Sequence, residues 1–175
     1  VGIARARGLI AAVGTDAVIL PSMFPVFEYE RPRGPYAIGT AVYELKHGPQ
    51  NRDLVVQAWY PTASGLHGHL AGIATHPAIL GTAYASFTGL PKPLFDHLRL
   101  IKTHALTNAA VAADRRQFPV VLFSHGPLGA NRSQSIFQME ALASAGFIAI
   151  AIDHTGYAST TIFPDGRAVP PGPEA

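Results

Sequence analysis

Residues 118–154 read FPVVLFSHGPLGANRSQSIFQMEALASAGFIAIAIDH. The runs 120–123 and 147–152 are apolar without alternation, which is typical of parallel strands buried on both faces. Between them, apolar residues recur at helical spacing, and Gly146 stands where a helix C-cap belongs. Strand, loop, helix and strand in this order predict one right-handed parallel βαβ unit.

The loop of residues 124–132 is expected at the carboxyl end of the first strand, where parallel sheets bind ligands. Asn131, with Gln134 three residues later, predicts a helix N-cap with a reciprocal partner. The free amides of a helix N-terminus favour negative charge. A His-Gly opening followed by another glycine resembles the oxyanion-hole loop of esterases and lipases, although any βαβ unit also needs a glycine-rich turn.

Six short segments carry a resemblance to a known family. They are GPYAIGT (34–40), VQAWYP (56–61), FPVVLFSHG (118–126), LASAGF (142–147), IDHT (152–155) and FPDGR (163–167). In this order they resemble the plasma-type (group VII) platelet-activating-factor acetylhydrolase family. These are α/β-hydrolases related to bacterial lipases, cutinases and dienelactone hydrolases. The similarity covers about residues 23–169 and corresponds to the amino-terminal half of the family's fold.

The resemblance implies an α/β fold, namely the amino-terminal part of an α/β-hydrolase with a mostly parallel, doubly wound sheet and an antiparallel first strand pair. The runs 39–46 and 53–60, joined by a turn with glycine and proline, predict this pair, which we expect at the sheet edge. We expect residues 1–36 to form an arm and linker. Residues 37–175 then form the amino-terminal half of a single domain.

Residues 61–117 are a long insertion in that domain. They include His67, His69 and His76, but the segment is rich in glycine and no carboxylate is near, so we expect no metal and no cofactor. The pattern at 91–102 predicts a short amphipathic helix. Long apolar-rich insertions often cover active sites, so this one is expected to be a lid or cleft wall, with plain surface packing as the alternative.

The family's nucleophile is absent from this stretch of sequence. It lies in Gly-x-Ser-x-Gly on a strand-to-helix elbow, and no serine of this chain has that setting. In the family the elbow, the acid and the triad histidine follow the matched segment. The resemblance therefore implies a serine carboxylic-ester hydrolase whose Ser, His and Asp come from a carboxy-terminal segment after Ala175. Its substrate would be a small ester, a lipid or a polyester.

The resemblance also assigns roles within the 124–132 loop. In the family, the residue after His-Gly donates a backbone N–H to the oxyanion, but here that residue is Pro127, which has no N–H. We therefore expect the donor at Leu128, with Gly126 giving the loop its shape and Pro127 facing the substrate cleft. We expect the ring of His125 to orient the loop by hydrogen bonding.

Asp153 and His154 end the second apolar run. Adjacent strand residues point to opposite sides, so these two cannot pair with each other in a triad. We expect Asp153 to accept hydrogen bonds from loop amides and Arg132 to make a structural ion pair. His154 and Tyr157 are expected to line the substrate cleft.

Two other functions stay open. A cutinase-like polyester hydrolase would share the strand that ends in Ile-Asp. A non-catalytic binding module with an α/β-hydrolase-like fold would account for the absent nucleophile. Composition argues against other classes, because a net charge of +2 with 14% charged residues gives no nucleic-acid-binding patch, and a chain without cysteine has no thiol nucleophile or disulfide.

The first residues are similar to the start of a signal sequence. Arg5 and Arg7 precede a short apolar run, but Asp16 and two prolines interrupt the pattern before it is long enough to span a membrane. We expect a docked arm that brings the protein near a membrane. This favours a secreted, periplasmic or membrane-associated protein.

Overall fold

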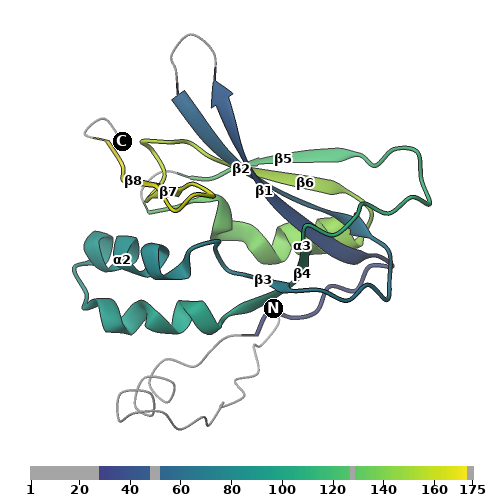
Figure 1. Cartoon of the computed structure of the whole chain (residues 1–175), viewed down its shortest axis with the longest axis horizontal. Coiled ribbons are helices and arrows are strands. Elements are labelled where there is room, and N and C mark those ends of the chain that lie inside the picture. Colours follow the sequence, from purple (N-terminus) through teal and green to yellow (C-terminus); the bar gives the residue numbers. More distant parts are fainter. Residues whose placement is uncertain (1–27, 48–51, 127–128, 173–175) are drawn as a thin grey trace, which may run out of the picture.

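The computed structural model describes residues 28–47, 52–126 and 129–172, so the amino-terminal arm lies outside the described residues. A six-stranded sheet, in the order β3-β4-β1-β2-β6-β5, forms the centre (Figure 1). Its strands are β1 (Ala37–His47), β2 (Arg52–Thr62), β3 (Leu70–Gly72), β4 (Lys102–Thr107), β5 (Val120–Ser124) and β6 (Ile148–Asp153). None of the helices in the described part of the chain is long and apolar enough to span a lipid bilayer.

The sheet is mixed and mostly parallel, as predicted. β1 pairs antiparallel with β2 and parallel with β4, while β6 pairs antiparallel with β2 and parallel with β5. β1, β4, β5 and β6 therefore share one direction. The expected position of the first strand pair at the sheet edge is wrong, because β4 adds beside β1 and β6 adds beside β2.

The βαβ unit is confirmed. After β5, a short 3₁₀-helix η2 (Arg132–Ser135) leads into α3 (Ile136–Ser144), which returns the chain to β6. The predicted C-cap is formed by Gly146 at φ 98°, with Phe147 N–H bonding to the Leu142 carbonyl and Gly146 N–H to the Ala143 carbonyl, both at 3.1 Å. This left-handed turn satisfies the last carbonyls of α3 and reverses the chain into the sheet.

The 61–117 insertion is more regular than its sequence indicates. It supplies β3, the helix α2 (Pro77–Thr88), the 3₁₀-helix η1 (Lys92–Leu100) and β4. The amphipathic segment predicted at 91–102 corresponds to η1. The sequence pattern does not predict α2 or β4. The residues that these two elements bury are mostly small or polar, so they give no clear apolar period.

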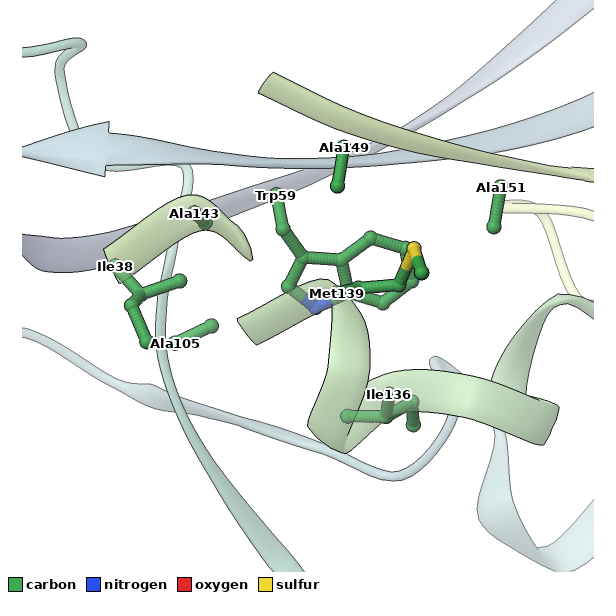
Figure 2. Packing of buried hydrophobic residues seen from close by; sticks show 8 residues of the cluster. All are labelled: Ile38, Trp59, Ala105, Ile136, Met139, Ala143, Ala149 and Ala151. Atoms are coloured by element: carbon green, nitrogen blue, oxygen red, sulfur yellow. The ribbon is translucent and has the colours of Figure 1, made fainter. Parts of the chain in front are cut away.

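The main core lies between α3 and the sheet (Figure 2). Trp59 of β2 is buried there. Ala149 and Ala151 of β6 face Met139 of α3, and small side chains at these positions let the helix approach the sheet closely. The cluster consists of Ile38, Trp59, Ala105, Ile136, Met139, Ala143, Ala149 and Ala151.

The two apolar runs are not buried on both faces within the described residues, contrary to expectation. Val120 and Leu122 of β5 keep 56% and 69% of their surface exposed. β6 alternates between buried and half-buried residues. The reason is that β5 is the outermost strand of the sheet, and α3 covers the face to which Ala149 and Ala151 point.

A small hairpin follows β6. In the sequence, Asp165-Gly166 between two short apolar runs predicts a hairpin with a type I′ turn. β7 (Thr161–Ile162) pairs antiparallel with β8 (Ala168–Val169), which confirms the hairpin. The expected type I′ turn is wrong, because Gly166 has a positive φ of 89° and Asp165 does not. A longer connection needs only this one left-handed residue. Arg167 joins the hairpin to the β1–β2 pair through Glu44, at 2.8 Å.

Glu140 is a buried carboxyl on the sheet-facing side of α3. Its Oε1 atom accepts the N–H of His104 in β4 at 2.8 Å. His104 lies where the pairing of β4 with β3 is irregular, between Leu70 and Gly72. The Oε2 atom of Glu140 has no hydrogen-bond partner among the described residues. Burial raises the pKa of Glu140 above its ordinary value of 4.5.

We expect Glu140→Ala to lower the free energy of unfolding of the intact protein by about 2–4 kcal/mol, because it leaves a buried amide unpaired and opens a cavity. Glu140→Gln keeps an acceptor at Oε1 and is expected to cost less than about 1 kcal/mol. Urea unfolding measures both. Asp96→Asn, at an exposed ion pair on η1, is the control and is expected to change little.

The raised pKa of Glu140 also makes the stability of the protein depend on pH. A raised pKa in the folded state stabilises the protein below about pH 4.5, and this contribution is lost as pH rises through the folded-state pKa. The Gln variant lacks it, so its stability relative to the wild type is expected to increase with pH. A difference that stays flat with pH, or equal losses for Gln and Ala, would contradict this account of Glu140.

Candidate functional site

The carboxyl ends of β5 and β6 meet at one edge of the sheet. Ser124, the last residue of β5, lies opposite Ile152 of β6 in a parallel register. The 124–132 loop therefore starts beside the residues that follow β6. Figure 1 shows α2 and the β7–β8 hairpin on this same side of the molecule. Pro127 and Leu128 lie outside the described residues, so their predicted roles stay predictions.

A buried ion pair fixes the end of the loop. Asp153 and Arg132 have almost no exposed side-chain surface, and Asp153 Oδ2 pairs with the Arg132 guanidinium. The other carboxylate oxygen accepts the backbone N–H of Arg132 at 2.6 Å. Arg132 also donates to the carbonyl of Ile162 in β7 at 3.2 Å. Both expectations, a carboxylate on a loop amide and a structural ion pair, are confirmed.

The helix start differs in detail from the prediction. Asn131 caps the turn by accepting the N–H of Ser133 at 2.9 Å, but Gln134 does not return to the amide of Asn131. Its side-chain oxygen lies 3.5 Å from the N–H of Gly126 instead. The reciprocal cap is not formed because the Gln134 side chain is directed to the start of the loop.

His125 contacts the loop and the neighbouring strand with both ring nitrogens. Nδ1 lies 2.8 Å from the carbonyl oxygen of Gly126, and Nε2 lies 3.2 Å from the backbone nitrogen of His154. A carbonyl only accepts and an amide only donates, so Nδ1 carries the proton and Nε2 accepts. In this arrangement the ring makes the hydrogen bonds that an orienting role requires.

A pair that the sequence reasoning missed joins Ser124 to His154. Ser124 Oγ lies 2.8 Å from His154 Nε2, and the rings of His154 and His125 are 5.2 Å apart. Burial lowers the pKa of His154, and the nearby His125 and Arg52 lower it further, against the opposing effect of Asp153. The pair depends on the β5–β6 register, which places residues 152 and 154 on the same face as Ser124.

The α2 helix of the insertion borders the loop. The ring of Phe87 lies over Gly129, where an added Cβ would come within 2.8 Å of it, and Gly129 has a φ of 82°. Both facts call for glycine at this position. Asn131 donates weakly to the hydroxyl of Tyr84 at 3.5 Å.

The remaining predicted site residue is Tyr157. It follows β6, keeps 44% of its surface exposed, and lies under the guanidinium of Arg52 at 5.4 Å. This places Tyr157 at the carboxyl edge with His154, although its predicted contact with substrate stays a prediction.

Among residues 28–47, 52–126 and 129–172, no three His, Cys, Asp or Glu side chains gather closely enough to hold a metal ion. Of the three histidines in the insertion, His76 has its ring 3.1 Å from the carbonyl oxygen of Pro164. This contact links the start of α2 to the β7–β8 connection.

Comparison with known proteins agrees with this arrangement. Residues 24–169 match the model of the family described as platelet-activating factor acetylhydrolase, isoform II. Among solved structures, the chain is similar to a ferulic acid esterase from Streptomyces cinnamoneus, with 28% sequence identity and a TM-score of 0.62. The match covers 82% of this chain and 40% of the esterase, so the matched part spans less than half of that protein's length. A search of curated proteins found no match.

We expect Arg132→Met or Asp153→Asn to lower the free energy of unfolding by about 3–5 kcal/mol, because each leaves a buried charge without its partner. The double variant Arg132→Met with Asp153→Asn removes both charges and is expected to lose less than the sum of the single losses. Denaturant unfolding of the intact protein measures the coupling. Additive losses would show that the two side chains do not interact.

Proposed function

Because the chain belongs to the platelet-activating factor acetylhydrolase, isoform II family of α/β-hydrolases, we propose that the complete protein is a serine carboxylic-ester hydrolase. The observation that carries the proposal is the 124–132 loop. It begins at the carboxyl end of a parallel strand, His125 holds its first peptide, and the buried Asp153–Arg132 pair holds its last. A glycine-containing loop fixed at both ends suits backbone amides that must be preorganised for an oxyanion.

The proposed reaction is acyl transfer through Ser, His and Asp. The serine attacks the ester carbonyl, the histidine takes the serine proton and passes it to the leaving alcohol, and the aspartate holds the histidine. Water then releases the acid by the reverse sequence. Two amides would stabilise the tetrahedral oxyanion, and we assign one to Leu128 and the other to the residue after the nucleophile.

The surroundings of Gly126 support this assignment. The amide of Gly126 already faces Gln134, and Pro127 has no N–H, so the next amide along the loop is that of Leu128. We assign loop orientation to His125. We place Pro127, His154 and Tyr157 in the substrate cleft, with the 61–117 insertion as a wall beside the loop, because Phe87 contacts Gly129.

The nucleophile, acid and base would come from a carboxy-terminal segment of the same polypeptide. β5 is the outermost strand of the described sheet, so one of its edges is unpaired there, and the side chains of Val120 and Leu122 are exposed on its face. Such edges invite aggregation unless they are covered. A further strand beside β5 would cover the edge and deliver the serine to the loop. The solved esterase is long enough to hold such a segment, since this chain matches 40% of it.

Two alternatives follow from particular observations. The lack of a Gly-x-Ser-x-Gly serine in this chain favours a non-catalytic binding module. Within the ester hydrolases, the substrate would be a small ester, a lipid or a polyester, the last as in a cutinase-like enzyme. These choices depend on the shape of a cleft that the carboxy-terminal segment would complete.

A fluorophosphonate that modifies active serines separates enzyme from binding module. The intact protein is expected to take up one label, on a serine after Ala175, with residues 1–175 unmodified by peptide mass spectrometry. A protein that takes up no label and hydrolyses no ester would support the binding module. A lone 18.5 kDa species that hydrolyses esters would place the nucleophile within this chain and contradict the two-part site.

The oxyanion assignment gives a sharper prediction. Leu128→Pro removes one backbone donor and is expected to lower kcat about 10²- to 10³-fold in the intact protein. Pro127→Ala is the matched control, because Pro127 has no N–H to lose. Steady-state hydrolysis of p-nitrophenyl acetate measures both. Unchanged turnover in a folded Leu128→Pro variant would reject the assignment.

A further inference from the structure

His154, the residue after β6, contacts the first two residues of the loop, and the second of these contacts the third. The ring of His154 bonds to Ser124 at 2.8 Å, and its backbone N–H bonds to the ring of His125 at 3.2 Å. The ring of His125 in turn bonds to the carbonyl of Gly126 at 2.8 Å. From this geometry, and resting on the proposed function, we propose that Ser124 and His154 are positioning residues that hold, through His125, the Gly126 carbonyl at the start of the proposed oxyanion loop.

The proposal depends on how little else holds Gly126. Apart from its chain neighbours, no atom of the described residues lies within 4 Å of a Cβ added at Gly126, so no side chain packs against its Cα on that side. Its amide has one long contact, at 3.5 Å, to Gln134. The shorter bond, from the His125 ring to the Gly126 carbonyl, therefore sets the orientation of the peptide that joins Gly126 to Pro127.

The ring of His125 needs support to keep that bond. The ring of His154 lies beside it, with centroids 5.2 Å apart and planes at 58°. The bond to Ser124 holds the His154 ring in place. The His154 ring in turn keeps the His125 ring from adopting another rotamer. Burial keeps His154 neutral at neutral pH by lowering its pKa, and a neutral ring can bond to a hydroxyl in either tautomer.

The position of Ser124 separates this role from a structural one. Its side chain is exposed at the end of β5, and its hydroxyl bonds to His154. Loss of the hydroxyl should therefore disturb the orientation of the two rings without opening a cavity. A misplaced loop peptide weakens binding of the transition state more than binding of the substrate, so the effect should fall on kcat and leave KM unchanged.

Ser124→Ala in the intact protein tests the proposal. We expect kcat for p-nitrophenyl acetate to fall about 3- to 10-fold, as for loss of one ordinary hydrogen bond, with KM and Tm unchanged. Ser124→Thr keeps the hydroxyl and is expected to restore most of kcat. Thr82→Ala removes an exposed hydroxyl on α2 and is the control for a nonspecific effect.

The proposal is overturned if Ser124→Ala keeps full kcat, if Ser124→Thr does not restore it, or if Tm falls together with kcat. Long-range ¹H–¹⁵N spectra of the histidine rings give a readout that does not need activity. They should show the Nδ1–H tautomer of His125 in the wild type and a mixture of tautomers in Ser124→Ala. Identical spectra would also overturn the proposal. If the spectra of the wild type and Ser124→Ala differ as expected but the wild type hydrolyses no ester, the proposed function is rejected instead.

Discussion

Asp153 is a buried carboxylate at the end of a strand, and the fold around the loop depends on what neutralises it. Removing a carboxylate from water costs several kcal/mol unless a partner and hydrogen bonds compensate. Arg132 supplies both, through its guanidinium and its own backbone N–H. Because Arg132 also bonds to Ile162, this one carboxylate joins the end of β6, the start of η2 and the β7–β8 hairpin.

Successive side chains along a strand point to opposite faces, so neighbouring residues contact different parts of the loop. Asp153 is buried and anchors the end of the loop, while His154 points the other way and contacts the start of the loop. The ring of His125 accepts the N–H of His154. The two ends of the loop are thus held by Asp153, the last residue of β6, and by His154, which follows it.

The sequence predicted the parts of the fold that depend on local chemistry. Continuous apolar runs identified β5 and β6, Gly146 marked the helix end, and the acid at position 153 was correctly expected on a loop amide. Long-range neighbours were not predictable in the same way. β4 buries Thr103 and Ala105, which carry no strong apolar signal, and the Ser124–His154 bond depends on a register that only the assembled sheet sets.

A crystal structure of the intact protein with a phosphonate bound to its nucleophile tests the central claim most directly, since the phosphonyl oxygen imitates the oxyanion. The account predicts that this oxygen lies about 2.7–3.1 Å from the backbone nitrogen of Leu128, with the phosphorus on a serine beyond Ala175 and His125 still bonded to the Gly126 carbonyl. A phosphonate on Ser124, or an oxygen directed away from the 124–132 loop, would contradict it.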